Sequence, residues 1–107
     1  MEFKLIEEIN KEEVNKKIYF NGYYYLTIEK NFSIDYTYLY INKTRDREYI
    51  PTLFLEKDLY THTIENITID VVGRGSLEVE EIEEVIKGYN IAIETVKELK
   101  ELLKEYM

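Results

Sequence analysis

The 107-residue sequence contains no cysteine, no tryptophan, one proline and one histidine. The absence of cysteine excludes disulfides, thiolate metal ligands and a cysteine nucleophile. It also fits a reducing compartment, and we expect a cytoplasmic location. The single histidine, His62, has no G-x-S-x-G elbow beside it, and a zinc site there would depend on Asp and Glu to complete its ligands. We therefore predict no metal site and no histidine-dependent catalysis.

Long apolar segments are also missing. No run approaches the length of about 18 residues that a membrane-spanning helix needs, so we expect a soluble protein without a membrane partner. The N-terminal residues include Glu2, Lys4, Glu7 and Glu8, and no apolar segment of about 7–15 residues follows them. We therefore expect no signal peptide.

Positive charge is scarce. The formal net charge is −8, and most of it comes from residues 61–107, which hold five basic and eleven acidic groups. A negative field of this size repels phosphate backbones and anionic lipid and attracts basic surfaces. We therefore predict a basic protein surface as the partner and no direct contact with nucleic acid.

The chain length is typical of one domain, and the sequence shows no linker, repeat or low-complexity segment. We predict a single domain covering residues 1–107. Leu5, Ile6, Ile9 and Val14 favour a short amphipathic helix within residues 2–16, and a strand at Phe3 to Ile9 is the alternative.

Residues 17–72 have the alternation and the turn signals of an antiparallel meander. Asn21-Gly22 lies between two strand-like segments and favours a type I′ turn, which has positive φ at both central positions. Residues 34–41 alternate strictly, so Tyr36, Tyr38 and Tyr40 are expected on one face of a strand.

Further strands are expected at residues 49–56 and 67–72, after a polar turn at residues 42–48. Pro51 within the first of these favours an edge or a bulge. Residues 78–105 have apolar side chains at spacings of three and four, which predicts one long helix with a broad apolar stripe. The members of this stripe are Ile82, Val85, Ile86, Tyr89, Ala92, Ile93, Val96, Leu99, Leu103 and Tyr106. The predicted fold is thus α+β, with an antiparallel sheet of four or five strands packed against one long C-terminal helix and a short N-terminal helix.

No segment carries a recognisable catalytic pattern. The run Gly73-Arg74-Gly75-Ser76 lacks the spacing and the lysine of a P-loop, and the glutamates after it would repel a phosphate. We interpret it as a strand-to-helix connection with Ser76 near the helix cap. Asp35 and Asp70 lie in alternating segments and show no asymmetry suited to acid–base catalysis. We expect a protein that is not an enzyme and that has no cofactor.

Two groups of side chains are candidate binding residues. Glu80, Glu81, Glu83 and Glu84 would form an array of negative charge on the first turns of the helix, with Asp70 nearby. This array is either a solvated face that suits the helix dipole or a ridge that can occupy a site built for DNA. The row of Tyr36, Tyr38 and Tyr40 is either cross-strand packing on a half-exposed face or a protein-binding surface; base stacking would need a basic surround.

In size, in net charge and in its glutamate cluster, the chain resembles the small acidic proteins of phages and mobile elements that block host defence, including anti-CRISPR and DNA-mimic proteins. The resemblance implies a non-enzymatic protein that docks on a basic surface, such as the nucleic-acid-binding channel of a defence protein. It carries no residue roles, because these proteins share no single fold. The alternative is a structural or assembly module that forms a homodimer through its long helix or its tyrosine-rich sheet face.

Overall fold

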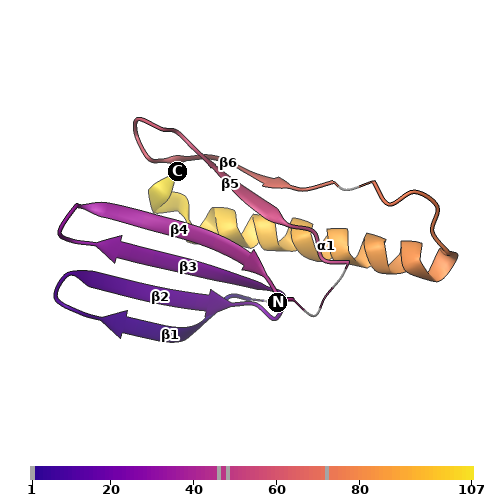
Figure 1. Ribbon diagram of the computed structural model, residues 1–107, viewed down its shortest axis with the longest axis horizontal. Coiled ribbons are helices and arrows are strands. Elements are labelled where there is room, and N and C mark those ends of the chain that lie inside the picture. The colour runs from indigo at the N-terminus through magenta and orange to yellow at the C-terminus, as the bar shows by residue number, and fades with distance from the viewer. Residues whose placement is uncertain (1, 46, 48, 72) are drawn as a thin grey trace. The chain divides into compact units, whose positions relative to one another are not determined.

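The chain folds as α+β, as predicted, but its strands form a four-stranded and a two-stranded sheet instead of the single sheet of four or five strands that was predicted. The computed structural model describes residues 2–45, 47, 49–71 and 73–107, so the predictions that fall on Asp46, Glu48 and Val72 lie outside it. It divides into two compact units, Met1–Thr44 and Arg45–Met107. The first unit holds a four-stranded sheet; the second holds a two-stranded sheet and the long helix (Figure 1). None of the described helices is both long and apolar enough to cross a membrane.

The first unit is an antiparallel meander in which each strand pairs with the next one along the chain. Its strands are β1 (Lys4–Asn10), β2 (Val14–Phe20), β3 (Tyr24–Asn31) and β4 (Tyr36–Lys43). The strand predicted at residues 34–41 is present as β4 but begins later, at Tyr36. Asp35, with a φ of 49°, belongs to the turn before β4. β1 and β4 form the two edges of this sheet (Figure 1).

The predicted N-terminal helix is wrong, and the alternative strand is present as β1. β1 pairs with β2 from Lys4 opposite Phe20 to Asn10 opposite Asn15, with a bulge that leaves Ile6 without a direct partner. A bulge adds one residue to an edge strand and interrupts the two-residue alternation of side chains. The apolar spacing in this segment resembles that of a helix for this reason.

The hairpin turn between β2 and β3 is present, but it is not the predicted type I′ turn. Only Gly22 has a positive φ there, at 96°, and Asn21 does not. The backbone N–H of Asn21 donates to the Tyr24 carbonyl, so the central residues are Gly22 and Tyr23. A positive φ at the first central position is the pattern of a type II′ turn. The Asn21 side chain stabilises the turn by accepting hydrogen bonds from the backbone N–H groups of Tyr23 (2.9 Å) and Tyr24 (2.8 Å).

The second unit consists of a β-hairpin and one long helix, and the bounds of its elements differ only modestly from those predicted. The elements are β5 (Leu53–Lys57), β6 (Ile64–Ile69), α1 (Val79–Leu102) and a 3-10 turn, η1 (Lys104–Tyr106). α1 contacts β6. Pro51 precedes β5, where its missing N–H costs no ladder bond. The N-cap of α1 is Glu78, so Ser76 lies in the connection two residues before the cap, near it as predicted.

Gly88 is the point of closest approach between α1 and the segment before β5. It is buried, and a Cβ at this position would overlap the carbonyl oxygen of Tyr49 and lie 2.9 Å from its carbonyl carbon. Tyr49 and Ile50 therefore form a turn and bend against the helix instead of the start of a strand. A glycine inside a helix can allow a close backbone approach or mark a bend, and Gly88 allows a close approach.

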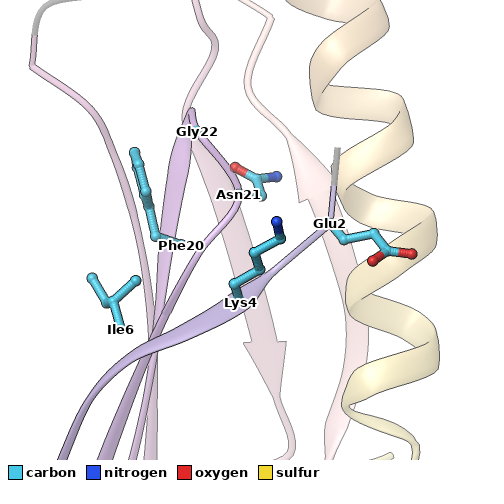
Figure 2. A pocket seen from close by; sticks show the side chains of 6 residues that line it. All are labelled: Glu2, Lys4, Ile6, Phe20, Asn21 and Gly22. Atoms are coloured by element: carbon cyan, nitrogen blue, oxygen red, sulfur yellow. The ribbon is translucent and has the colours of Figure 1, made fainter.

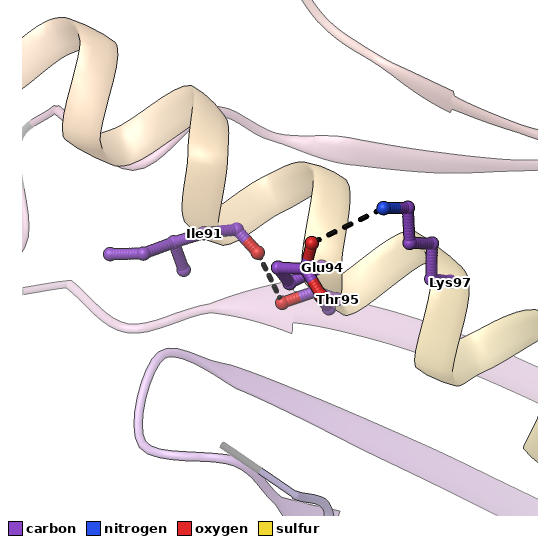
Figure 3. A network of polar contacts seen from close by, with 4 residues as sticks. All are labelled: Ile91, Glu94, Thr95 and Lys97. Atoms are coloured by element: carbon purple, nitrogen blue, oxygen red, sulfur yellow. Dashed lines mark hydrogen bonds and ion pairs between the residues drawn. The ribbon is translucent and has the colours of Figure 1, made fainter.

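The broad apolar stripe predicted for α1 is divided in the structure. The buried residues of the helix are Gly88, Ala92, Thr95 and Leu99. Thr95 donates to the Ile91 carbonyl at 2.8 Å, so its buried hydroxyl is satisfied (Figure 3). Other members of the predicted stripe, including Ile82, Ile86 and Ile93, are exposed.

Replacement of Gly88 by alanine should destabilise the second unit. Alanine is intrinsically the better helix former by about 1 kcal/mol, so a loss of stability would come from the overlap with the Tyr49 backbone. We expect Gly88→Ala to lower the free energy of unfolding by about 1–3 kcal/mol. The measurement is urea denaturation followed by circular dichroism at the helix band.

Asn90→Ala is the matched control, because Asn90 is an exposed residue of the same helix. It should leave stability unchanged or raise it by up to about 0.7 kcal/mol. A Gly88→Ala variant as stable as the wild type would contradict the close contact.

Candidate functional site

The first turns of α1 carry the acidic surface of the second unit. Glu80, Glu83 and Glu84 are exposed to solvent. Within the described part of the chain, neither Glu80 nor Glu83 pairs with a lysine or arginine. Glu84 lies 3.8 Å from Lys87, and both side chains are well exposed, so this pair holds the carboxylate only weakly. These three glutamates form the acidic ridge.

Glu81 was predicted to join this array, but its carboxylate is engaged inside the second unit. Its Oε2 accepts a hydrogen bond from the Tyr49 hydroxyl at 3.2 Å. Its Oε1 accepts one from the backbone N–H of Glu78 at 3.4 Å, as in a capping box. The spacing in the sequence could have revealed this, since Glu81 precedes buried Gly88 by one heptad and so shares its side of the helix.

Arg74 lies over the ring of Tyr49 in the connection before α1. Its guanidinium carbon lies 5.1 Å from the centre of the Tyr49 ring, a distance typical of a cation–π contact. The same tyrosine thus contacts Arg74 through its ring and Glu81 through its hydroxyl. Gly75 has a φ of 70°, which lets the connection turn toward the helix.

Asp70 lies beside a later turn of α1 than the ridge. Its backbone carbonyl accepts a hydrogen bond from the Tyr89 hydroxyl at 3.0 Å, and its N–H donates to the Thr52 carbonyl at 2.9 Å. Tyr89 is in the third turn of the helix, beyond the two turns that carry the acidic ridge. The backbone carbonyl of Asp70 therefore links the residue after β6 to α1 through this hydrogen bond.

The tyrosine row of Tyr36, Tyr38 and Tyr40 lies on one face of β4, as predicted. The Tyr36 and Tyr38 rings are 4.5 Å apart in an edge-to-face arrangement, and the Tyr38 and Tyr40 rings are 6.2 Å apart and nearly parallel. Tyr40 is 48% exposed. Leu39, on the opposite face, is buried. The row belongs to the first unit and the acidic ridge to the second.

A depression of about 560 Å³ lies at the end of the first unit where β1 begins (Figure 2). Its lining residues are Glu2, Lys4, Ile6, Phe20, Asn21 and Gly22. Asn21 already holds the hairpin turn through its side-chain oxygen. The charged groups of the lining are one ammonium, from Lys4, and one carboxylate, from Glu2.

The β5–β6 hairpin ends in a tight tip that the sequence did not mark as a candidate. Asp58 accepts hydrogen bonds from the backbone N–H groups of Tyr60 (2.7 Å) and Thr61 (2.9 Å). These two bonds, that from Thr61 first, lower the pKa of Asp58. Leu59 and Tyr60 are the most exposed large apolar side chains described, at 86% and 93%. The signal that could have revealed the tip is an Asp followed closely by turn residues.

His62 is located in this tip. It is exposed, has a φ of 61°, and donates its backbone N–H to the Asp58 carbonyl at 3.0 Å. Across residues 2–45, 47, 49–71 and 73–107, no three His, Asp or Glu side chains are grouped so that they could hold a metal ion. His62 is thus a residue of the hairpin turn.

Comparisons of the chain with protein-family models, with curated proteins and with solved structures found no match.

The Asp58 turn makes a pH-dependent prediction. Because its pKa is lowered in the folded state, the carboxylate stabilises the turn above the ordinary value of 3.8, and this contribution is lost as the pH falls through the lowered pKa. We expect the amide proton shifts of Tyr60 and Thr61 to titrate with a midpoint below 3.8, measured by NMR. Asp58→Asn should abolish the titration, and a midpoint at or above the ordinary value would contradict the hydrogen bonds.

Proposed function

We propose that this chain is a non-enzymatic binding protein that docks on a basic protein surface through the acidic ridge of α1. The observation that carries the proposal is the exposure of Glu80, Glu83 and Glu84 without a strong internal cation. Surface carboxylates of one sign attract a positive partner and raise the rate of encounter. Glu81 is left out of the binding set, since its carboxylate is engaged by Tyr49 and Glu78.

The basic surface that fits best is one that normally holds nucleic acid. Glu83 and Glu84 are three and four residues after Glu80 on the helix, which separates their Cβ atoms from that of Glu80 by about 5–6 Å. This spacing is comparable to that of successive phosphates along a strand. Occupation of such a channel by the ridge would exclude the nucleic acid and inhibit the partner. A role in blocking host defence would follow if the partner is a defence nuclease.

The tyrosine row is the second surface of this proposal. Tyrosine offers a large rigid ring with a polar tip, and aromatic side chains are enriched where protein interfaces are strongest. Tyr40 has the exposure needed for such an anchor; its ring contacts that of Tyr38, which in turn contacts Tyr36. Because the row lies on another unit than the ridge, its contribution is tested separately.

The ridge is tested by neutralising its charge. We expect Glu80→Gln, Glu83→Gln and Glu84→Gln together to weaken retention of basic proteins by about tenfold, since each exposed pair contributes roughly 0.5 kcal/mol. The measurement is capture from a host lysate on the immobilised protein, with the salt concentration at elution and the affinity of each purified partner as readouts. Binding of the wild type should weaken as salt rises.

The control carries the same change of net charge elsewhere. Glu7→Gln, Glu12→Gln and Glu13→Gln together neutralise three exposed glutamates of the first unit. This variant should retain the same partners as the wild type, at the same salt concentration. Equal loss in both variants would show that net charge alone matters, and the ridge would then have no specific role.

If the tyrosine row is part of the interface, loss of its exposed ring should weaken partner binding at any salt concentration. Tyr40→Thr keeps a good strand former and removes the exposed ring. We expect it to weaken binding of the captured partner by about fivefold or more at high salt as well as low salt. Tyr60→Thr, which removes an exposed tyrosine from the hairpin tip, should have no effect. Unchanged binding by Tyr40→Thr would remove the row from the interface.

A further inference from the structure

The exposed side of α1 carries an apolar stripe of its own. Val79, Ile82, Ile86 and Ile93 are 65%, 44%, 55% and 44% exposed. Their spacings of three, four and seven residues correspond to the first and fourth positions of successive heptads, the pattern of a helix that packs along another helix. Tyr89 and Val96 occupy the remaining positions of this pattern and are half-buried.

The stripe lies beside the buried side of α1, not on it. The residues just before Ile86, Ile93 and Lys100 in the heptad are Val85, Ala92 and Leu99, and these are half-buried or buried in the second unit. The helix therefore has one apolar face that is divided lengthwise into a covered part and an exposed part. The exposed part runs along about 21 Å of the helix axis between Val79 and Ile93.

One flank of the stripe carries polar and charged side chains, and their order indicates that a second copy of α1 packs against the stripe. This flank carries Glu83, Asn90 and Lys97, one heptad apart, and all three are exposed. Glu83 and Lys97 lie equally far before and after Asn90. The charges on this flank therefore match the opposite charges of a second copy that runs in the reverse direction. Two copies of α1 packed in opposite directions about Asn90 would place Glu83 of each beside Lys97 of the other. Packed in the same direction, the copies would place this flank beside the opposite flank of the stripe, which carries Val85 and Ala92 and offers no opposite charge to Glu83.

Both charges are accessible for such a contact. Glu83 pairs with no lysine or arginine among the residues described. Lys97 lies 3.3 Å from Glu94 of its own helix, but its side chain is 68% exposed and the pair is at the surface (Figure 3). An exposed pair of this kind contributes little and exchanges easily for another partner.

We propose that the chain forms an antiparallel homodimer in which the stripe of α1 packs against the same stripe of a second copy, with Glu83 of each copy beside Lys97 of the other. Such a two-fold interface uses the same patch on both copies and closes on itself, so it forms no filament. By helical periodicity, Glu80 and Glu84 lie on other sides of α1 and stay outside the dimer. The dimer does not depend on a basic partner. It takes Glu83 out of the acidic ridge and leaves Glu80 and Glu84 of each copy exposed to such a partner.

The test is sedimentation velocity of the full chain between about 5 and 500 µM, the range in which a small helix-pair interface is populated. The wild type is expected to move from monomer toward dimer mass as its concentration rises. Ile86→Glu, which puts a charge in the centre of the stripe, should remain monomeric. Circular dichroism verifies that each variant keeps its helix.

Charge exchange then tests the direction and register. Glu83→Lys and Lys97→Glu should each weaken dimerisation by about tenfold, because each creates like-charge contacts at both ends of the pair. The double variant should recover the wild-type dissociation constant within about twofold. Glu84→Lys is the matched control, since it makes the same change of charge outside the stripe, and it should dimerise like the wild type.

Three results would overturn the proposal. The first is a wild type that stays monomeric over the whole concentration range. The second is a dimer that persists in Ile86→Glu, which would place the interface elsewhere, for example on the tyrosine row. The third is a double variant as weak as the single ones, which would exclude the antiparallel register. Each of these leaves the binding of a basic partner by the acidic ridge to be decided by its own experiment.

Discussion

The second unit depends on the contact between the Tyr49 backbone and α1 at Gly88. No side chain fits between the Tyr49 backbone and Gly88. The segment before β5 therefore lies closer to the helix axis than it could if residue 88 had a side chain. From this position the Tyr49 hydroxyl reaches Glu81 and its ring lies under Arg74. One close backbone contact thereby determines which glutamate turns inward and which remain available at the surface.

This inward turn changes the meaning of the acidic cluster. A run of glutamates at the start of a helix suits the helix dipole and the N-cap whether or not it binds anything. Glu81 belongs to the capping box and contacts Tyr49, whereas the three carboxylates of the ridge have no comparable role among the contacts of the described residues. Their exposure is what a binding surface requires, and it is the reason the ridge, and not the whole cluster, carries the proposed function.

The apolar side chains of α1 and of β4 show how the same pattern serves two purposes. Along α1, Leu99 is fully buried while Ile86 and Ile93 remain in water, although all three belong to one periodic stripe. Along β4, Leu39 is buried and Tyr40 is half exposed on the other face. In both elements the exposed apolar groups are ordered along a line, on the helix by heptad spacing and on the strand by ring contacts. Such ordered apolar surface is well suited to association with another protein or another copy.

Local chemistry by itself determined the long helix, the hairpin at Asn21-Gly22 and the common face of the tyrosines, because each follows from the period of side chains along a helix or strand or from the backbone freedom of glycine. Tertiary structure decided the rest. Periodicity could not reveal that residues 4–10 form a strand, since the extra residue of the bulge at Ile6 imitates helical spacing. Nor could it say which part of a broad apolar stripe is covered or which glutamate turns inward. Those outcomes depend on segments distant in sequence, such as Tyr49 at Gly88, and no property of the helix alone specifies which neighbour arrives there.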